Sequence, residues 1–161
     1  MKNLEELLEH EIQDLYSAES QLVEALPKML KAANDSKLKM AFENHIEETK
    51  HQKKRLEKVA EMLSIRPDGE KCKGMEGLIM ECEKMIKEDA DTEVKDAGLI
   101  GTAQKVEHYE IAGYGTARQF AEMLGKREIA NLLSETLEEE KDADEIMTDL
   151  AVEKINKMAM A

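Results

Sequence analysis

Polar side chains interrupt four apolar helical stripes of this sequence, at positions where a core should be hydrophobic. In the first, a heptad-like series runs from Leu8 to Met29 at spacings of four and three residues, and Glu19 occupies one of its positions. In the other three, acids or a histidine fall on or beside the stripe in the same way. The candidate metal ligands defined by this pattern are Glu19, His45, Glu48, Glu107, Glu110, Glu140 and Asp144.

The same acids are predicted to share one height along the helices. Counted from a turn near Asn34, Glu19 lies about fifteen residues back and Glu48 about fourteen forward, which differs by only about 1.5 Å of helical rise. Around a second turn near Gly125, the acids match in height in the same way. The matching pairs there are Glu110 with Glu140, and Glu107 with Asp144. We therefore expect one layer of carboxylates across the bundle.

A buried layer of ionised carboxylates needs a positive partner, because unpaired charge in a core costs more than a domain's stability of about 5 to 15 kcal/mol. No Lys or Arg falls on the central stripe positions near this layer. The sequence therefore predicts two divalent metal ions as the cofactor. Carboxylate oxygens with an imidazole favour Fe or Mn, although such a site could also take Mg, Ca or Zn according to supply.

The sequence leaves open which residue of the second helix completes the ligand set. His45 faces inward three residues before Glu48, so it is either a metal ligand or a core histidine. His51 completes a Glu48-x-x-His51 motif, yet it falls about 130° from the centre of the stripe. Gln52 lies on the stripe and is a third candidate.

The elements that must position these residues are helices, because turn-forming and aromatic residues are scarce: 8 Gly, 2 Pro and 3% aromatic. Two short connections predict two antiparallel hairpins, and the nearly thirty residues between them predict a crossover. We expect an all-α fold, a ferritin-like antiparallel four-helix bundle with a short extra crossover helix, as a single domain over residues 1–161. The helices are expected at about 3–33, 37–63, 75–89, 93–124 and 127–157.

The charge balance excludes two classes of partner. With 36 acidic against 23 basic residues, the net charge of -13 repels nucleic acid and anionic membrane surfaces. No apolar run approaches the roughly 20 residues that span a bilayer, and the first ten residues lack the apolar segment of a signal peptide. We expect a cytoplasmic protein.

Five stretches of the sequence resemble the YciF-type proteins, and the likeness covers nearly the whole chain. They are residues 14–19 (DLYSAE), 45–49 (HIEET), 75–79 (MEGLI), 104–112 (QKVEHYEIA) and 136–141 (TLEEEK). The resemblance implies a bacterial, ferritin-like homodimer associated with stress responses, whose activity is unsettled. By architecture, the pattern of rubrerythrin maps onto Glu19, Glu48, Glu107, Glu110 and Glu140. One departure is that no His stands three residues after Glu140.

The leading hypothesis is a cytoplasmic stress-response protein with a carboxylate-rich dinuclear metal site, capable of rubrerythrin-like chemistry on peroxide or ferrous iron. In it, Glu48 and Glu107 bridge the metals, and Glu19, Glu110 and Glu140 are terminal ligands. The alternative is a non-catalytic, metal-stabilised structural or interaction bundle. A third hypothesis, an iron-storage cage, requires higher assembly.

Overall fold

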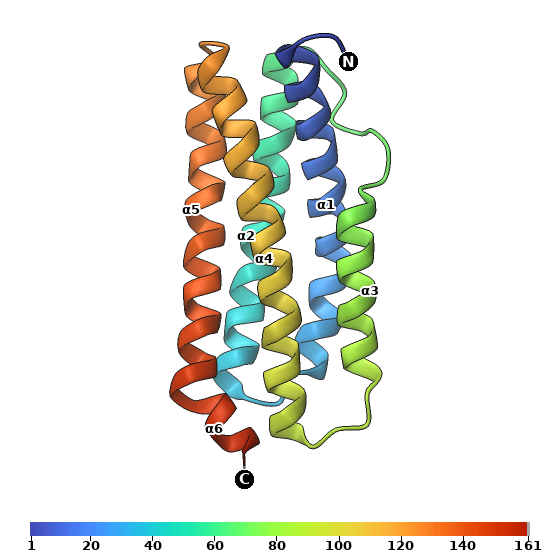
Figure 1. Cartoon of the computed structure of the whole chain (residues 1–161), viewed down its shortest axis with the longest axis vertical. Coiled ribbons are helices and arrows are strands. Elements are labelled where there is room, and N and C mark those ends of the chain that lie inside the picture. The colour runs from blue at the N-terminus through green and yellow to red at the C-terminus, as the bar shows by residue number, and fades with distance from the viewer. Residues whose placement is uncertain (161) are drawn as a thin grey trace.

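The computed structural model describes residues 1–160, and almost all of them lie in helices (Figure 1). Three connections join the principal helices, and the longest of them carries α3. The elements in chain order are α1 (Leu4–Ala32), α2 (Ser36–Leu63), α3 (Lys73–Lys87), α4 (Thr92–Met123), α5 (Arg127–Leu150), the π-helical segment η1 (Ala151–Ile155) and α6 (Asn156–Ala159).

Local sequence signals account for where the helices begin and end. The side chain of Asn3 accepts a hydrogen bond from the amide of Glu6 at 2.8 Å and so caps α1. Asp35 caps α2 in the same way. Ser64, in the left-handed region with φ of 58°, ends α2, and Gly125 with φ of 71° follows α4, where the absence of a Cβ makes this conformation inexpensive.

The four long helices form two antiparallel hairpins, α1 with α2 and α4 with α5 (Figure 1). Helix α3 lies beside α1 and α4 and carries the chain from one hairpin to the other. The predicted ferritin-like antiparallel four-helix bundle with a short crossover helix is therefore confirmed. The predicted helix over 127–157 differs in one respect, because the α-helical bonding of α5 ends at Leu150 and gives way to the π-helical η1.

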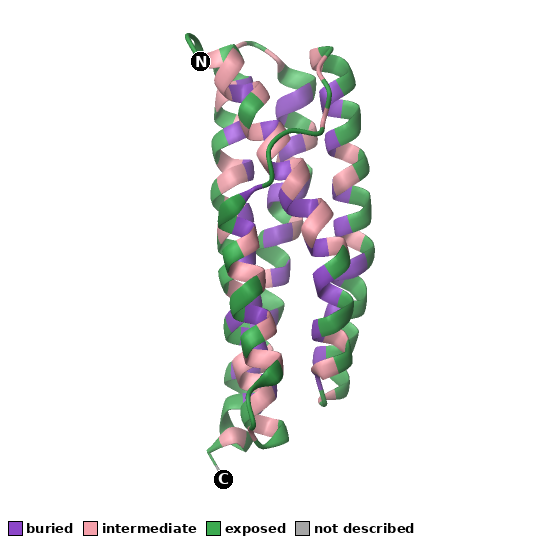
Figure 2. Cartoon of the chain, turned by 90° about the vertical axis from the view of Figure 1, so that its right-hand side faces the viewer, coloured by how far each residue is buried: buried purple, intermediate pink, exposed green. Residues whose placement is uncertain are grey.

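Two apolar clusters fill the bundle, one toward each end. The cluster near the α1–α2 turn includes Leu22, Phe42 and Met147, and the one at the opposite end includes Leu15 and Leu56. Figure 2 shows the buried positions in purple along the inward faces of the helices and the exposed positions in green along their outer faces. Between the two apolar clusters every long helix contributes buried polar residues, so the core consists of two hydrophobic halves separated by a polar layer.

None of the helices within residues 1–160 has an apolar stretch of the length that a membrane crossing requires.

One buried carboxylate joins the two hairpins. Asp96 of α4 accepts hydrogen bonds from the amide of Asn34 at 2.8 Å and from the amide of Asp35 at 2.7 Å, both in the α1–α2 turn. We expect Asp96→Ala to lower the free energy of unfolding by about 2 kcal/mol, because two amides lose a charged acceptor. Urea denaturation measures the change. The control is Asp91→Ala, since the Asp91 side chain makes no capping hydrogen bond, and an equal loss in both variants would contradict the prediction.

Candidate metal centre

Four buried side chains of the polar layer converge on one point. One ligand atom from each of His45, Glu107, Glu110 and Glu140 can be chosen so that all of them lie within 4.8 Å of one another. The four residues come from α2, α4 and α5. Glu107 and Glu110 stand three residues apart, so both project from one face of α4. Such a group of carboxylates and an imidazole could hold a metal ion.

Glu19 of α1 adjoins these four residues and is fully buried. The charge of Glu140 acts on it, and its own charge acts on Glu110. Its Oε1 accepts a hydrogen bond from the hydroxyl of Tyr114, which is also buried. The Oε2 atom of Glu19 has no hydrogen-bond partner within residues 1–160. We name Glu19, His45, Glu107, Glu110 and Glu140 together the acidic layer.

The acidic layer fits a metal because its polar atoms are left without partners. Within residues 1–160, every buried side-chain nitrogen or oxygen that lacks a hydrogen bond, except Nε of Arg118, belongs to this layer or to Gln52. The His45 Nε2 atom lies 3.2 Å from Glu107 Oε1, but it is not aligned for a hydrogen bond. Buried polar atoms are normally paired, and a bound cation could satisfy the oxygen and nitrogen atoms that are unpaired here.

Burial also makes the carboxyl groups hard to ionise when no cation is present. It raises the pKa of Glu19, Glu107 and Glu110 well above the usual value of 4.5, and the neighbouring charge of Glu140 raises each further. Burial lowers the pKa of His45, but the carboxylates of Glu48 and Glu140 outweigh it, so the net pKa is raised. A bound cation would reverse this effect on the carboxyl groups by favouring their ionised form.

Two of the candidate ligands lie outside the acidic layer. The side chain of Glu48 is 45% exposed, and its Oε2 lies 3.6 Å from Nδ1 of His45, on the side away from Glu107. Asp144 is partly exposed and accepts hydrogen bonds from Gln104 at 3.0 Å, while its second oxygen lies 3.2 Å from Nε2 of His108. His51 is exposed and contributes nothing to the layer. The structure thus brings together five of the seven candidates.

A polar chain that the sequence did not reveal supports Glu140. Gln52 Nε2 donates to Glu140 Oε1 at 2.5 Å and to Glu139 Oε2 at 3.1 Å. Arg55 donates to Glu139 at 2.9 Å and to Thr136 at 2.6 Å. A basic side chain therefore does approach the site, but it is neutralised by Glu139 and does not reach the acidic layer. Only the position of Gln52 on the α2 stripe hinted at this arrangement.

The hydroxyl of Tyr114 donates a hydrogen bond to Glu19, and removing this hydroxyl tests how much the bond contributes to stability. We expect Tyr114→Phe to lower the free energy of unfolding of the metal-free chain by about 2 kcal/mol, because Glu19 Oε1 would be left buried and unpaired. Tyr16→Phe is the matched control, since the Tyr16 hydroxyl donates to the exposed Glu57, and its cost should stay below about 0.5 kcal/mol. Equal costs in urea denaturation would contradict this role of Tyr114.

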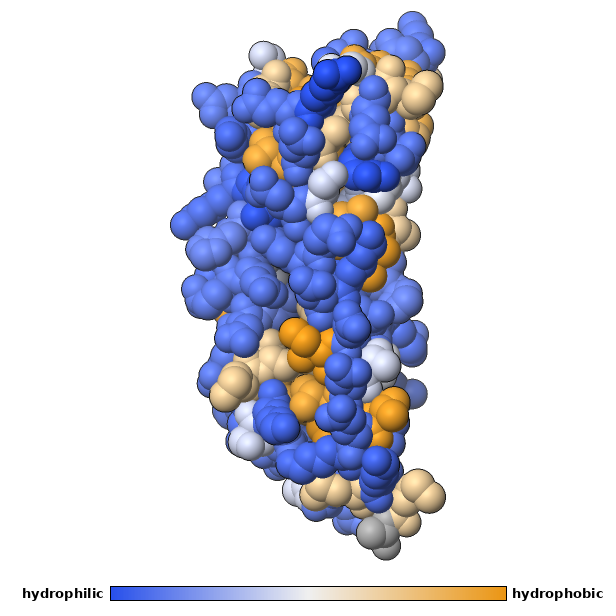
Figure 3. Space-filling view, turned by 90° about the vertical axis from the view of Figure 1, so that its left-hand side faces the viewer, coloured by the Kyte–Doolittle hydropathy of each residue, from blue (hydrophilic) through white to orange (hydrophobic). Residues whose placement is uncertain are grey.

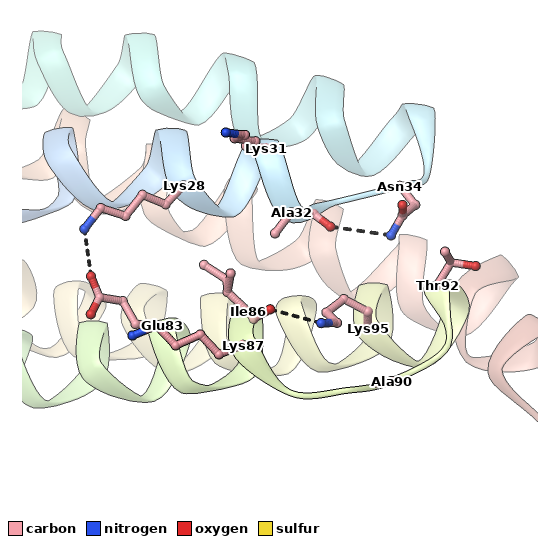
Figure 4. Close-up of a pocket in the computed structure, with 10 residues that line it drawn as sticks. All are labelled: Lys28, Lys31, Ala32, Asn34, Glu83, Ile86, Lys87, Ala90, Thr92 and Lys95. Atoms are coloured by element: carbon pink, nitrogen blue, oxygen red, sulfur yellow. Dashed lines mark hydrogen bonds and ion pairs between the residues drawn. The ribbon is translucent and has the colours of Figure 1, made fainter.

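A large open cavity lies away from this layer. A cavity of about 780 Å³ lies between the C-terminal ends of α1 and α3 and the start of α4. Figure 4 shows Lys28 paired with Glu83 on one side of it, and Lys95 donating to the carbonyl of Ile86 on the other. None of the candidate metal ligands lines this cavity. This cavity is therefore separate from the acidic layer.

Comparison with known protein families identifies the family of this chain. A profile of the family described as a domain of unknown function (DUF892) matches residues 3–160. The chain belongs to the DUF892 family. The relative YciF of Escherichia coli strain K12 is 49% identical over 160 residues, which is 99% of this chain and 96% of YciF.

Solved structures agree with the assignment to the DUF892 family. The crystal structure of the E. coli stress protein YciF superposes with a TM-score of 0.94 at 49% identity, covering 98% of this chain and 99% of that one. YcfI of Rhodopseudomonas palustris gives a TM-score of 0.89 at 41% identity, covering 92% and 94% of the two chains. A protein from Xanthomonas campestris, at 21% identity and a TM-score of 0.74 over 92% and 90% of the chains, shares the fold.

Proposed function

We propose that this chain is a stress-response protein that holds two divalent metal ions in the acidic layer, Fe or Mn, and uses them for redox chemistry on peroxide or ferrous iron. The observation that carries the proposal is the charge of the layer. Glu19, Glu107, Glu110 and Glu140 are all buried, and when ionised they carry four negative charges, which two divalent cations neutralise. The E. coli relative is itself a stress protein.

The residues present define how such a pair would be held. His45, Glu107, Glu110 and Glu140 supply one nitrogen and several oxygens, and Glu19 supplies a further carboxylate on the side of Tyr114. When bound, a reduced Fe or Mn pair would supply the two electrons that reduce one peroxide molecule, one from each ion, and an external electron donor would be needed to reduce the pair again. The protein orients the ligands through Tyr114 and Gln52, which bond to Glu19 and Glu140. The two apolar clusters keep bulk water away from the layer.

The test is anaerobic loading of the purified, metal-free chain with Fe(II) or Mn(II), followed by metal analysis and rapid mixing with peroxide and with oxygen. We expect close to two metal ions per chain, and oxidation of the Fe(II)-loaded protein faster than that of Fe(II) in buffer. Loading that stays well below one metal per chain would contradict the proposal at its first step.

The alternative function is a metal-stabilised structural bundle, and one observation favours it. The carboxylates of the layer are sealed from solvent, as suits a permanently held structural cation, whereas a reactive site must also admit a peroxide. The R. palustris relative YcfI has been suggested as a structural protein. A rise in thermal stability on metal binding, with no turnover of peroxide or oxygen, would favour this function over the redox one.

We also propose that the protein is a cytoplasmic homodimer, on the strength of its resemblance to the YciF-type proteins. Light scattering should give twice the mass of one chain. A much larger particle would instead indicate an iron-storage cage.

A further inference from the structure

A second cavity, of about 390 Å³, opens on the side of the molecule formed by α2 and α5. One of its walls is apolar and comes mainly from α5, including Ala143 and Ile146. The other comes from α2 and mixes the apolar Met40 and Ala41 with polar residues, which are Lys37, Asn44, His45 and Glu48. Lys37 lies eleven residues before Glu48, about 16 Å away along the helix, so the part of the wall beside His45 carries a carboxylate and no basic residue. In Figure 3, which views the α5 side, apolar side chains in orange gather in the lower half of the face, toward the α1–α2 turn. The cavity therefore joins the protein surface to a member of the acidic layer.

The other members of the layer have no such access. Glu19, Glu110 and Glu140 are fully buried, and Glu107 is 1% exposed. A hydrated cation outside the protein therefore cannot contact them directly. His45 is itself 3% exposed, but it lines the cavity with one face and approaches Glu107 Oε1 to 3.2 Å. A cation that reaches His45 is thus one step from the carboxylates.

A cation that enters the cavity from solution would contact Glu48 before His45. The side chain of Glu48 is 45% exposed and lines the cavity, and its Oε2 lies 3.6 Å from Nδ1 of His45. No Lys or Arg within residues 1–160 forms an ion pair with it, whereas its neighbour Glu47 is paired with Lys50 at 2.6 Å. The apolar wall formed by α5 offers a cation no competing ligand. Solvent, Glu48, His45 and Glu107 therefore form a continuous series of contacts.

We propose that the cavity between α2 and α5 is the portal through which divalent cations reach the acidic layer, and that Glu48 is the carboxylate that captures them and passes them to His45. The proposal rests on the metal site described above and assigns Glu48 to uptake of the ions. The proposal concerns ions that arrive from solution. Such ions can contact Glu48, which is exposed, but they cannot contact the buried carboxylates of the acidic layer directly.

The experiment measures the rate of cation uptake separately from the amount bound. Metal-free, full-length protein is mixed anaerobically with Co(II), whose visible absorption changes on coordination, and the bound metal is then quantified. We expect Glu48→Gln to slow uptake about tenfold, because one steering and ligating charge is lost, and to leave the final stoichiometry unchanged. Glu47→Gln is the control: it removes the same charge one residue away and should leave the rate near that of the wild type.

The dependence of the uptake rate on ionic strength is a second test of cation capture by Glu48. Added salt should slow uptake by the wild type, because it screens the attraction between Glu48 and the cation, and it should slow Glu48→Gln less. Loss of a merely structural contact would not change the salt dependence.

A second variant tests the cavity and leaves the charge in place. Ala143 lines the cavity and lies one turn from Glu140, so Ala143→Leu should narrow the path and slow uptake while the salt dependence persists. Ala112→Leu, at an exposed position of α4, is its control. Thermal unfolding of each metal-free variant shows whether it is folded before its uptake is measured.

The outcomes are distinguishable. Equal uptake rates in Glu48→Gln and the wild type would overturn the portal. A reduced number of bound ions in Glu48→Gln would overturn it as well, because Glu48 would then be a resident ligand. A wild-type chain that binds no metal at all would instead refute the metal site on which the portal rests.

Discussion

Replacing Glu140 by Gln is expected to remove most of the stabilisation that metal ions give this protein. Glu140 is buried, belongs to the group of converging ligand atoms, and is held by Gln52. A neutral amide of the same size leaves the packing intact but is a poor ligand for a hard cation. At a Mn(II) concentration of about 1,000 times the dissociation constant, each occupied site should add about 4 kcal/mol to the unfolding free energy of the wild type.

For Glu140→Gln we expect an affinity about 100-fold weaker, so that the gain per site at the same Mn(II) concentration falls to about 1.4 kcal/mol. Urea denaturation with and without Mn(II) measures both values. Glu138→Gln is the matched control, because Glu138 is exposed on the same helix and paired with Lys141 at 2.7 Å. A full metal-dependent gain in Glu140→Gln would show that the cation binds elsewhere.

The metal-free protein should become less stable as the pH rises from about 5 to 8. In the folded chain the pKa of Glu19, Glu107 and Glu110 lies well above the usual 4.5, mainly because of burial. The folded state then retains protons that the unfolded chain releases above about pH 4.5. The contribution of these groups is fully present below the unfolded pKa and is lost as the pH rises toward the folded pKa, with a slope of about 1.4 kcal/mol per pH unit for each retained proton.

The other titratable groups with shifted pKa values do not cancel this loss of stability between pH 5 and 8. The pKa of His45 is also raised in the folded state, which gives the same sign. The pKa values of Asp35 and Glu139 are lowered, the first mainly by Lys154, so their contributions are already complete above about pH 5. Added Mn(II) should reduce or reverse the slope, because metal ligands must be deprotonated to bind. A metal-free stability that stays flat between pH 5 and 8 would contradict these pKa shifts.

The fold and much of the layer could be predicted because both follow from helical periodicity. Glu19 replaces one residue of an unbroken apolar series, and Glu107, Glu110 and Glu140 interrupt equally regular stripes. Equal counts from the two turns place them at one height. The structure shows these four side chains buried between the two apolar clusters. The identity of the two hairpins follows from the same spacing, since the short connections leave antiparallel packing as the compact arrangement.

The remaining candidates depended on side-chain direction, which periodicity fixes only to within tens of degrees. Glu48 lies about 60° from the stripe that contains His45, and this offset is enough to turn it to the cavity mouth. Asp144 follows Glu140 by one turn, where it meets Gln104 and His108. The sequence left His45 as ligand or core residue, and the structure places it against Glu107.

The contacts of Gln52 and Arg55 could not be foreseen for a different reason. They cross from α2 to Glu139 and Glu140 of α5, so they depend on which long helices are neighbours and on the rotation of each about its axis. Hydrophobic spacing within one helix does not contain that information.

The most direct test of the central claim is anomalous X-ray diffraction from crystals grown anaerobically with Mn(II), recorded at the manganese edge. We predict two anomalous peaks within coordinating distance of Glu19, His45, Glu107, Glu110 and Glu140. Crystals whose only anomalous peaks lie at surface carboxylates, with ordered water or no density among these five side chains, would contradict it.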